Sequence, residues 1–135
     1  MGVSFCFRKN ERITSKLLLD QLFSSKEARA ITSFPLRVVF LEVDRHESDA
    51  QVQVLFSVSK RHFKHAVDRN RVKRQLREAY RRNKSLLPEI AEGRQLLVAF
   101  IWITDKILIS GKVESAMVKA LQKIKRSMTP AVTEN

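Results

Sequence analysis

Basic side chains gather on one face of a predicted helix that runs from Val67 to Lys84. Guanidinium groups dominate this face, and each offers forked N–H donors that match phosphate oxygens in pairs. Like charges one turn apart repel by a few tenths of a kcal/mol per pair, and Asp68 and Glu78 are too few to neutralise them. The pattern favours a polyanionic partner over a merely solvated face. At about 100° per residue the members that fall together are Asn70, Lys73, Arg74, Arg77 and Arg81.

The face beside these cations is apolar. Four residues recur there at i, i+4, i+7 and i+8, which is typical of a helix face packed on a core: Val72, Leu76, Ala79 and Tyr80. Asp68 stands where we expect the N-cap, because its carboxylate could accept the free N–H groups of the first turn. One face of the helix should therefore be held by the core while the next presents its cations.

Groups suited to catalysis are sparse. A protein nuclease needs clustered carboxylates that hold metal ions, or histidines placed for acid–base work. The acids of residues 44–49 fall in a polar turn, and Glu11 and Asp20 flank the first predicted helix without an acidic neighbour. His62 and His65 lie in a basic loop, where a phosphate contact or simple exposure is expected. We therefore expect no catalytic residue and no metal site within the protein.

The composition points to nucleic acid. The 135 residues include 26 Lys and Arg against 14 Asp and Glu, a formal net charge of +12 that attracts anions. A membrane is a poor second candidate, because no apolar run approaches the length of a spanning helix and the basic helix has a small apolar face without Trp. Cys6 alone gives no disulfide framework or zinc site, and we find no signal peptide. We expect a cytoplasmic protein.

The surrounding elements indicate one α+β domain. Pro35 lies within the first expected strand and favours an edge position or a strand start, and residues 44–49 read as a polar hairpin connection. The last expected strand is nearly all apolar, as in the middle of a sheet. Besides the basic helix we expect helices at 16–25, with Ser15 as N-cap, and 110–127, and strands at 30–43, 51–59 and 95–104.

These elements give the order α-β-β-α-β-α. We predict a single-domain α–β sandwich over residues 1–128, with a central, mostly antiparallel sheet, and a disordered tail over residues 129–135. The basic helix would be the crossover between two parallel strands. General chirality makes such a crossover right-handed in about 98% of cases.

The basic helix also resembles a known family. Its sequence Arg69-Asn70-Arg71-Val72-Lys73-Arg74, followed by Leu76-Arg77-Glu78-Ala79-Tyr80-Arg81, closely resembles the "RNR" signature of the bacterial ribonuclease P protein subunit. Ser57-Val58-Ser59-Lys60 and Ala66-Val67 match the same family, and a weaker resemblance extends from Phe7 to the last helix. The resemblance implies a left-handed crossover, against the general rule.

In this family the RNA subunit is the ribozyme that uses Mg²⁺ to hydrolyse the phosphodiester at the 5′ end of mature tRNA. The protein supplies binding and electrostatic screening. The resemblance therefore implies ribonuclease P RNA and precursor tRNA as partners, RNA-bound Mg²⁺, and no required protein partner. Arg69 falls near the core stripe, so a structural role is its alternative. Contacts to the catalytic RNA are implied for Arg69, Asn70, Arg71, Lys73, Arg74, Arg77 and Arg81.

The family also holds the single-stranded 5′ leader of precursor tRNA in a cleft between the first helix and the sheet. Such a site needs aromatic platforms and a positive rim. Each aromatic candidate could instead be a core residue. Leu19 replaces a common aromatic, and residues 61–65 lack the usual glycine. The implied cleft residues are Phe23, Phe34 and Phe40 as platforms, with Arg12 and Lys60 at the rim.

Two other functions are alternatives. A structural ribosomal protein that binds rRNA would share the composition, but it has no reason to carry the block from Arg69 to Arg81. A DNA-binding module would need a helix packed just before the basic helix, as in a helix-turn-helix, whereas a strand is expected there. We therefore expect a subunit of an RNA-based endoribonuclease that removes the 5′ leader of precursor tRNA, with the catalytic site in the RNA.

Overall fold

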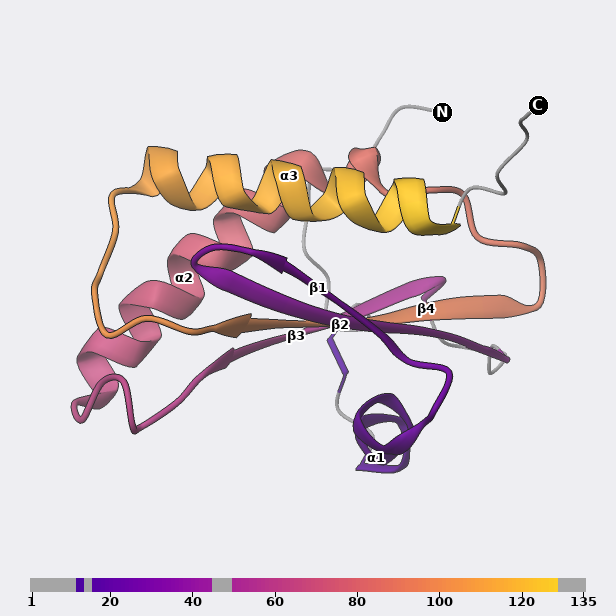
Figure 1. The fold of residues 1–135 in the computed structure, drawn as a ribbon, viewed down its shortest axis with the longest axis horizontal. Helices are drawn as coiled ribbons and strands as arrows, with labels where there is room; N and C mark the ends of the chain where they lie inside the picture. The colour runs from indigo at the N-terminus through magenta and orange to yellow at the C-terminus, as the bar shows by residue number, and fades with distance from the viewer. Residues whose placement is uncertain (1–11, 14–15, 45–49, 129–135) are drawn as a thin grey trace.

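The computed structural model describes residues 12–13, 16–44 and 50–128 (Figure 1). The predicted cap Ser15 and the predicted tail 129–135 lie outside them. A short 3₁₀ turn, η2 (Lys84–Leu86), follows α2. The helices and strands of the described residues are α1 (Lys16–Ser24), β1 (Arg29–Ser33), β2 (Leu36–Asp44), β3 (Val52–Val58), α2 (Ala66–Asn83), β4 (Arg94–Trp102) and α3 (Ser110–Met128).

The described strands form one sheet in the order β1-β2-β4-β3. β2 pairs antiparallel with both β1 and β4, whereas β3 pairs in parallel with β4. The central position predicted for the apolar segment 95–104 is confirmed, because β4 has a partner on each side and residues 95–100 are all buried. The mixed α+β class and the parallel pair joined by the basic helix are confirmed as well.

The first part of the sheet differs from the expectation. The single strand expected at 30–43 is two strands joined by a tight turn at Phe34 and Pro35, so the sheet has one strand more than predicted. Proline cannot donate to a strand ladder, and here it immediately precedes β2. Residues 44–49 were expected to form a hairpin, but the strands that they connect, β2 and β3, do not pair because β4 lies between them.

The main core lies between the sheet and the layer of α2 and α3 (Figure 1). The predicted stripe of α2 is confirmed, because Val72, Leu76, Ala79 and Tyr80 are all buried. α3 also buries one apolar face, formed by Val113, Ala116, Met117, Ala120, Leu121 and Ile124, and Met128 at its end is half-buried. Along each strand, alternate residues face this core. In β2 these are Leu36, Val38 and Phe40, and in β4 they are Leu96, Val98, Phe100 and Trp102.

Three aromatic rings fasten α2 to the sheet. Tyr80 of α2 lies 5.8 Å from Phe100 of β4 and 6.0 Å from Phe56 of β3, measured between ring centroids. Phe56 and Phe100 stack on each other at 5.6 Å. Aromatic pairs at such separations contribute about 0.5–1.5 kcal/mol beyond the area that they bury. The cluster fixes the rotation of α2 about its own axis, and therefore the direction in which its polar face points.

The start of α2 is also not as predicted. The cap residue is His65, which has an extended backbone (φ −91°, ψ 133°) and makes no side-chain cap hydrogen bond. Asp68, expected to be the N-cap, lies within the first turn instead. Its carboxylate can still interact favourably with the positive end of the helix dipole there. The helix therefore begins about three residues earlier than the capping pattern indicated.

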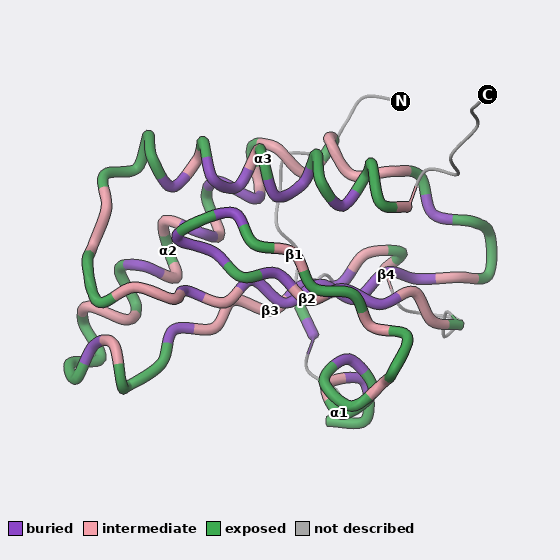
Figure 2. The backbone as a smooth tube through the Cα atoms, viewed as in Figure 1, coloured by how far each residue is buried: buried purple, intermediate pink, exposed green. Residues whose placement is uncertain are grey.

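α1 lies alone on the opposite face of the sheet and covers only part of it (Figure 1). Leu18 and Leu22 are buried against Leu41 of β2 and against Leu97 and Ala99 of β4. Most of the remaining surface of α1 is exposed (Figure 2). The part of this sheet face that α1 leaves uncovered lies toward the carboxyl end of β4.

The burial of α2 gives a stability prediction. Leu76 is fully buried, so Leu76→Ala should lower the free energy of unfolding by about 2–5 kcal/mol through lost apolar burial and a cavity. Urea denaturation followed by circular dichroism measures this change. Arg74→Ala, on the exposed side of the same helix, is the matched control and should change it by about 0.5 kcal/mol or less. Equal losses in both variants would contradict the assignment of the two faces.

Candidate nucleic-acid interface

Two of the cations predicted on α2, Lys73 and Arg77, lie beside β3. We call Asn70, Lys73, Arg74, Arg77 and Arg81 the α2 row. Asn70 and Arg74 are exposed, as is Arg71 beside the row, whereas Lys73 and Arg77 are half-buried. Lys73 and Arg77 line a hollow of about 170 Å³ together with Arg12 and β3. The structure thus brings three cations from two distant parts of the chain to one edge of the sheet.

Arg69 has the structural position that its place near the core stripe suggested. Its Nη1 donates to the backbone carbonyl of Phe63 at 2.8 Å and to that of Lys64 at 3.0 Å. These bonds tie the preceding loop to the first turn of α2. They hold the start of the helix in place, where no side-chain cap hydrogen bond is made. An RNA contact by Arg69 stays a prediction.

The carboxyl end of the α2 row is partly neutralised. Arg81 Nε donates to Glu78 Oε2 at 3.1 Å, and Arg81 Nη2 bonds the other carboxylate oxygen. The hydrogen bond from Arg81, together with the charges of Arg81 and Arg82, lowers the pKa of Glu78. Arg82 lies 3.6 Å from Glu114 of α3, which links the two helices. The cations nearer the start of the row are therefore better placed for an external anion than Arg81.

A second candidate surface is the space beside α1, which we call the α1 cleft. It is an open hollow of about 450 Å³ in which Phe23 of α1 and Arg37 of β2 lie together with Arg61 of the basic loop. Its floor includes Val39 and Ile101. Phe23 is 52% exposed, so part of the residue is open to solvent. An aromatic platform next to two guanidinium groups is the arrangement that single-stranded nucleic acid requires.

His62 borders the α1 cleft as well. Its Nδ1 lies 2.5 Å from the carboxylate of Asp105, in the segment after β4. The contact joins the basic loop to the far side of the cleft and holds the imidazole in place. Because a carboxylate only accepts hydrogen bonds, the ring makes this bond in a form that carries a proton on Nδ1. His62 lies beside Arg61 in the lining of the cleft, and a phosphate contact by this histidine stays a prediction.

Three of the predicted cleft residues lie elsewhere. Phe40 is 2% exposed and belongs to the core beneath α2 and α3, because it has the same parity along β2 as Leu36 and Val38. Phe34 lies on the β1–β2 turn and faces α3. Arg12 bridges to Val54 at the edge of the sheet, beside the α2 row. Of the five, Phe23 lines the α1 cleft, and Lys60 is exposed in the loop that supplies Arg61.

Sequence reasoning missed two cations of the α1 cleft. Arg37 falls between Leu36 and Val38 in β2, and strand alternation alone turns it to the face opposite the main core. That signal was present in the sequence. Arg61 enters the cleft only through the path of the basic loop, which no local pattern specifies.

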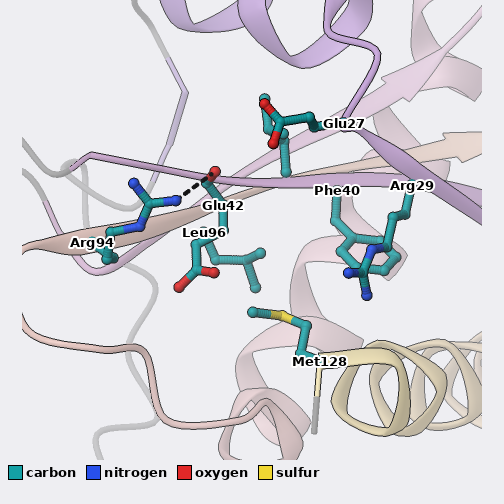
Figure 3. A pocket seen from close by; sticks show the side chains of 8 residues that line it. Glu27, Arg29, Phe40, Glu42, Arg94, Leu96 and Met128 are labelled. Atoms are coloured by element: carbon teal, nitrogen blue, oxygen red, sulfur yellow. Dashed lines mark hydrogen bonds between the residues drawn. The ribbon is translucent and has the colours of Figure 1, made fainter. Parts of the chain in front are cut away.

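A further hollow, of about 190 Å³, lies where β1, β2 and β4 approach the end of α3 (Figure 3). Its charged side chains are Glu27, Glu42, Arg29 and Arg94, so the lining has no net charge. Arg94 donates to the Glu42 carbonyl at 3.3 Å and pairs with Asp44 at 2.6 Å. This hollow is therefore less suited to a polyanion than the α1 cleft.

The described residues contain neither a candidate metal centre nor a helix that could span a membrane. No group of three or more His, Cys, Asp or Glu side chains gathers there in a way that could hold a metal ion. None of the described helices combines the length and the apolar character that crossing a membrane requires.

The relatives found by sequence carry one name. The ribonuclease P protein component of Porphyromonas gingivalis is 37% identical over 134 residues, which cover 98% of this chain and 96% of the relative. The ribonuclease P protein component of Chlorobium phaeobacteroides is 36% identical over 104 residues, which cover 71% of this chain and 70% of the relative. The first of these alignments spans the α2 row and the α1 cleft together.

Solved structures share the fold. The RNase P protein of Thermotoga maritima superposes with a TM-score of 0.62 at 22% identity, covering 87% of this chain and 98% of that one. A Staphylococcus aureus RNase P protein mutant with defective mRNA degradation activity superposes with a TM-score of 0.65 at 19% identity. The superposition covers 87% of this chain and 90% of that one. The family model described as Ribonuclease P matches residues 7–125. The chain therefore belongs to the ribonuclease P protein family.

Proposed function

We propose that this chain is the protein subunit of ribonuclease P. It binds the catalytic RNA and the 5′ leader of precursor tRNA, and so aids the Mg²⁺-dependent endonucleolytic removal of the leader. The observation that carries the proposal is the α2 row, which consists of residues of the family signature and is held outward by the buried stripe on the same helix. The proposed site of action is the cytoplasm.

The α2 row is the proposed contact to the catalytic RNA. A-form RNA presents phosphates and 2′-hydroxyl groups more than readable base edges, which suits guanidinium forks. Asn70 and Arg74 are the exposed members near the start of the row, and Arg71 lies beside them. Lys73 and Arg77 extend the positive surface toward Arg12 at the sheet edge. Binding by this surface needs no base-specific contact.

The α1 cleft is the proposed contact to the leader. Phe23 offers a ring on which an unpaired base can stack, while Arg37 and Arg61 can neutralise neighbouring phosphates. Because the cleft and the α2 row lie on different sides of the sheet, two RNA molecules can be held at once. The net charge of +12 then lowers the repulsion between them.

Catalysis is proposed to reside in the RNA. The Mg²⁺ that the reaction uses would be held by RNA oxygens, which are hard ligands of the kind that this ion prefers. The protein residues would bind and orient the two RNAs and screen their charge. No further protein partner is part of the proposal.

Cleavage of a 5′-extended precursor tRNA at low Mg²⁺ tests the proposal directly. The protein alone should leave the precursor intact, a bacterial ribonuclease P RNA alone should cut it slowly, and the mixture should cut fastest at the mature 5′ end. Cleavage by the protein alone would place an active site in this chain. If the protein adds nothing to the RNA, the alternative of a structural rRNA-binding protein is favoured.

Arg74→Ala tests the α2 row. The variant should bind the catalytic RNA more weakly and flatten the dependence of log K on log salt by about 0.7–0.9, the contribution of one phosphate contact. Filter binding at several salt concentrations measures both quantities. Lys26→Ala, which removes one exposed cation from the turn between α1 and β1, should leave the slope within error. A weaker affinity with an unchanged slope would assign Arg74 a structural role.

Phe23→Ala tests the α1 cleft. Loss of the stacking platform should reduce the preference for precursor over mature tRNA by about 1–3 kcal/mol, while binding to the catalytic RNA stays the same. The readout is the ratio of the two dissociation constants measured with the holoenzyme. Leu17→Ala removes an exposed apolar side chain from the same helix outside the cleft and is the control. A similar effect of both variants would argue against a specific leader contact.

A further inference from the structure

A second line of cations follows the flank of α3 that borders β1 and the β1–β2 turn, away from the sites described above. Its members recur at i, i+7, i+11 and i+14, which places them within one narrow strip of the helix surface. The strip is about 21 Å long at 1.5 Å per residue. All four side chains are exposed. We call this set the α3 strip: Lys112, Lys119, Lys123 and Arg126.

The charge of the α3 strip is not compensated within its own helix. Glu114 is the only acid of α3, and it is directed at α2, where it lies 3.6 Å from Arg82 and accepts a bond from Asn83 at 3.1 Å. Lys123 donates to the carbonyl of Thr32 at 2.7 Å, which anchors the strip to β1 but cancels no charge. An anion that approaches this face therefore meets four positive groups.

An exposed aromatic ring stands beside the strip. Phe34, on the turn between β1 and β2, is 66% exposed and shares a hollow of about 280 Å³ with Lys112 and Lys119. The turn is fixed against α3, because the Ser33 hydroxyl donates to the carbonyl of Ala116 at 3.0 Å. Packing in the core does not explain a phenyl ring held in this exposed position. A ring beside two ammonium groups matches the requirements of an unpaired nucleotide.

The position of the strip indicates which RNA it meets. α3 and α2 form one layer on one side of the sheet, whereas α1, which contributes Phe23 to the α1 cleft, lies on the opposite side (Figure 1). An RNA that contacts the α2 row already borders this helix layer. The leader, held on the far side of the sheet, does not. The α3 strip therefore faces the partner of α2 and not the occupant of the α1 cleft.

We propose that the α3 strip and Phe34 bind a single-stranded segment of the catalytic RNA, separate from the part that contacts the α2 row. This inference rests on the proposed function. Lysine is a compact point charge, so the strip would follow phosphates without reading sequence. Phe34 would stack one unpaired base, since a base within a duplex has no free face to offer. The protein would thus bind the catalytic RNA at two surfaces, the α2 row beside β3 and the α3 strip beside β1, which are the two edge strands of the sheet.

Binding to a bacterial ribonuclease P RNA tests this proposal with the full chain. Phe34→Ala should weaken binding about tenfold, and Phe34→Tyr, which keeps a flat ring, should restore it. Lys119→Gln should weaken binding a few-fold and flatten the salt dependence by about 0.7. Lys26→Gln is the matched loss of one exposed cation outside the strip and should leave both unchanged. Circular dichroism shows that each variant is folded.

The outcomes separate this proposal from the proposed function. If the wild-type protein does not bind the RNA, the proposed function fails and this inference fails with it. If Arg74→Ala weakens binding while Phe34→Ala and Lys119→Gln do not, only the α3 proposal is overturned. It is also overturned if those two variants change the preference for precursor over mature tRNA and leave binding to the catalytic RNA intact, because the strip would then contact the substrate.

Discussion

The packing of Tyr80 of α2 against Phe56 and Phe100 of the sheet is the constraint on which the rest of the molecule depends. A helix that carries this many cations has little reason to form in isolation, since repulsion along its polar face opposes it. Burial of one apolar stripe offsets that cost, and the rings of Phe56 and Phe100 fix the rotation of the helix. Once the rotation of the helix is fixed, helix geometry sets the direction in which each residue of its polar face projects.

The few acids of the helix layer are placed so that they shape the positive surface without removing it. Glu78 neutralises Arg81 at one end of the α2 row, and Glu114 holds Arg82 at the junction with α3. Asp68 is the one acid in the first turn of α2, and no acid lies along the α3 strip. Self-repulsion is thus reduced where helices must pack, and the charge remains where an anion can approach. The net charge of +12 is therefore unevenly distributed over the surface.

The sequence pattern alone was sufficient for the stripe of α2 and for the central position of β4, because each depends on one element and its burial. It was not sufficient at Phe34 and Phe40. The alternation of residues 34, 36, 38 and 40 suggested one continuous strand, and the turn at Pro35 interrupts it. The same alternation shows that Phe40 shares the core face, so that error was avoidable. The approach of Arg61 to Phe23 depends on tertiary structure and has no local signal.

The sheet order has a consequence for how the chain is made. β4 lies between β2 and β3, yet it is the last of the described strands to leave the ribosome. β1 and β2 can pair as soon as they are synthesised, but β3 has no neighbouring strand until residue 102 has emerged. During that interval the helix from Ala66 to Asn83 lacks the surface that supports it, and a free helix of this length is marginal in water. Newly made chains would therefore pass through a stage that is strongly cationic but not yet shaped for its partner.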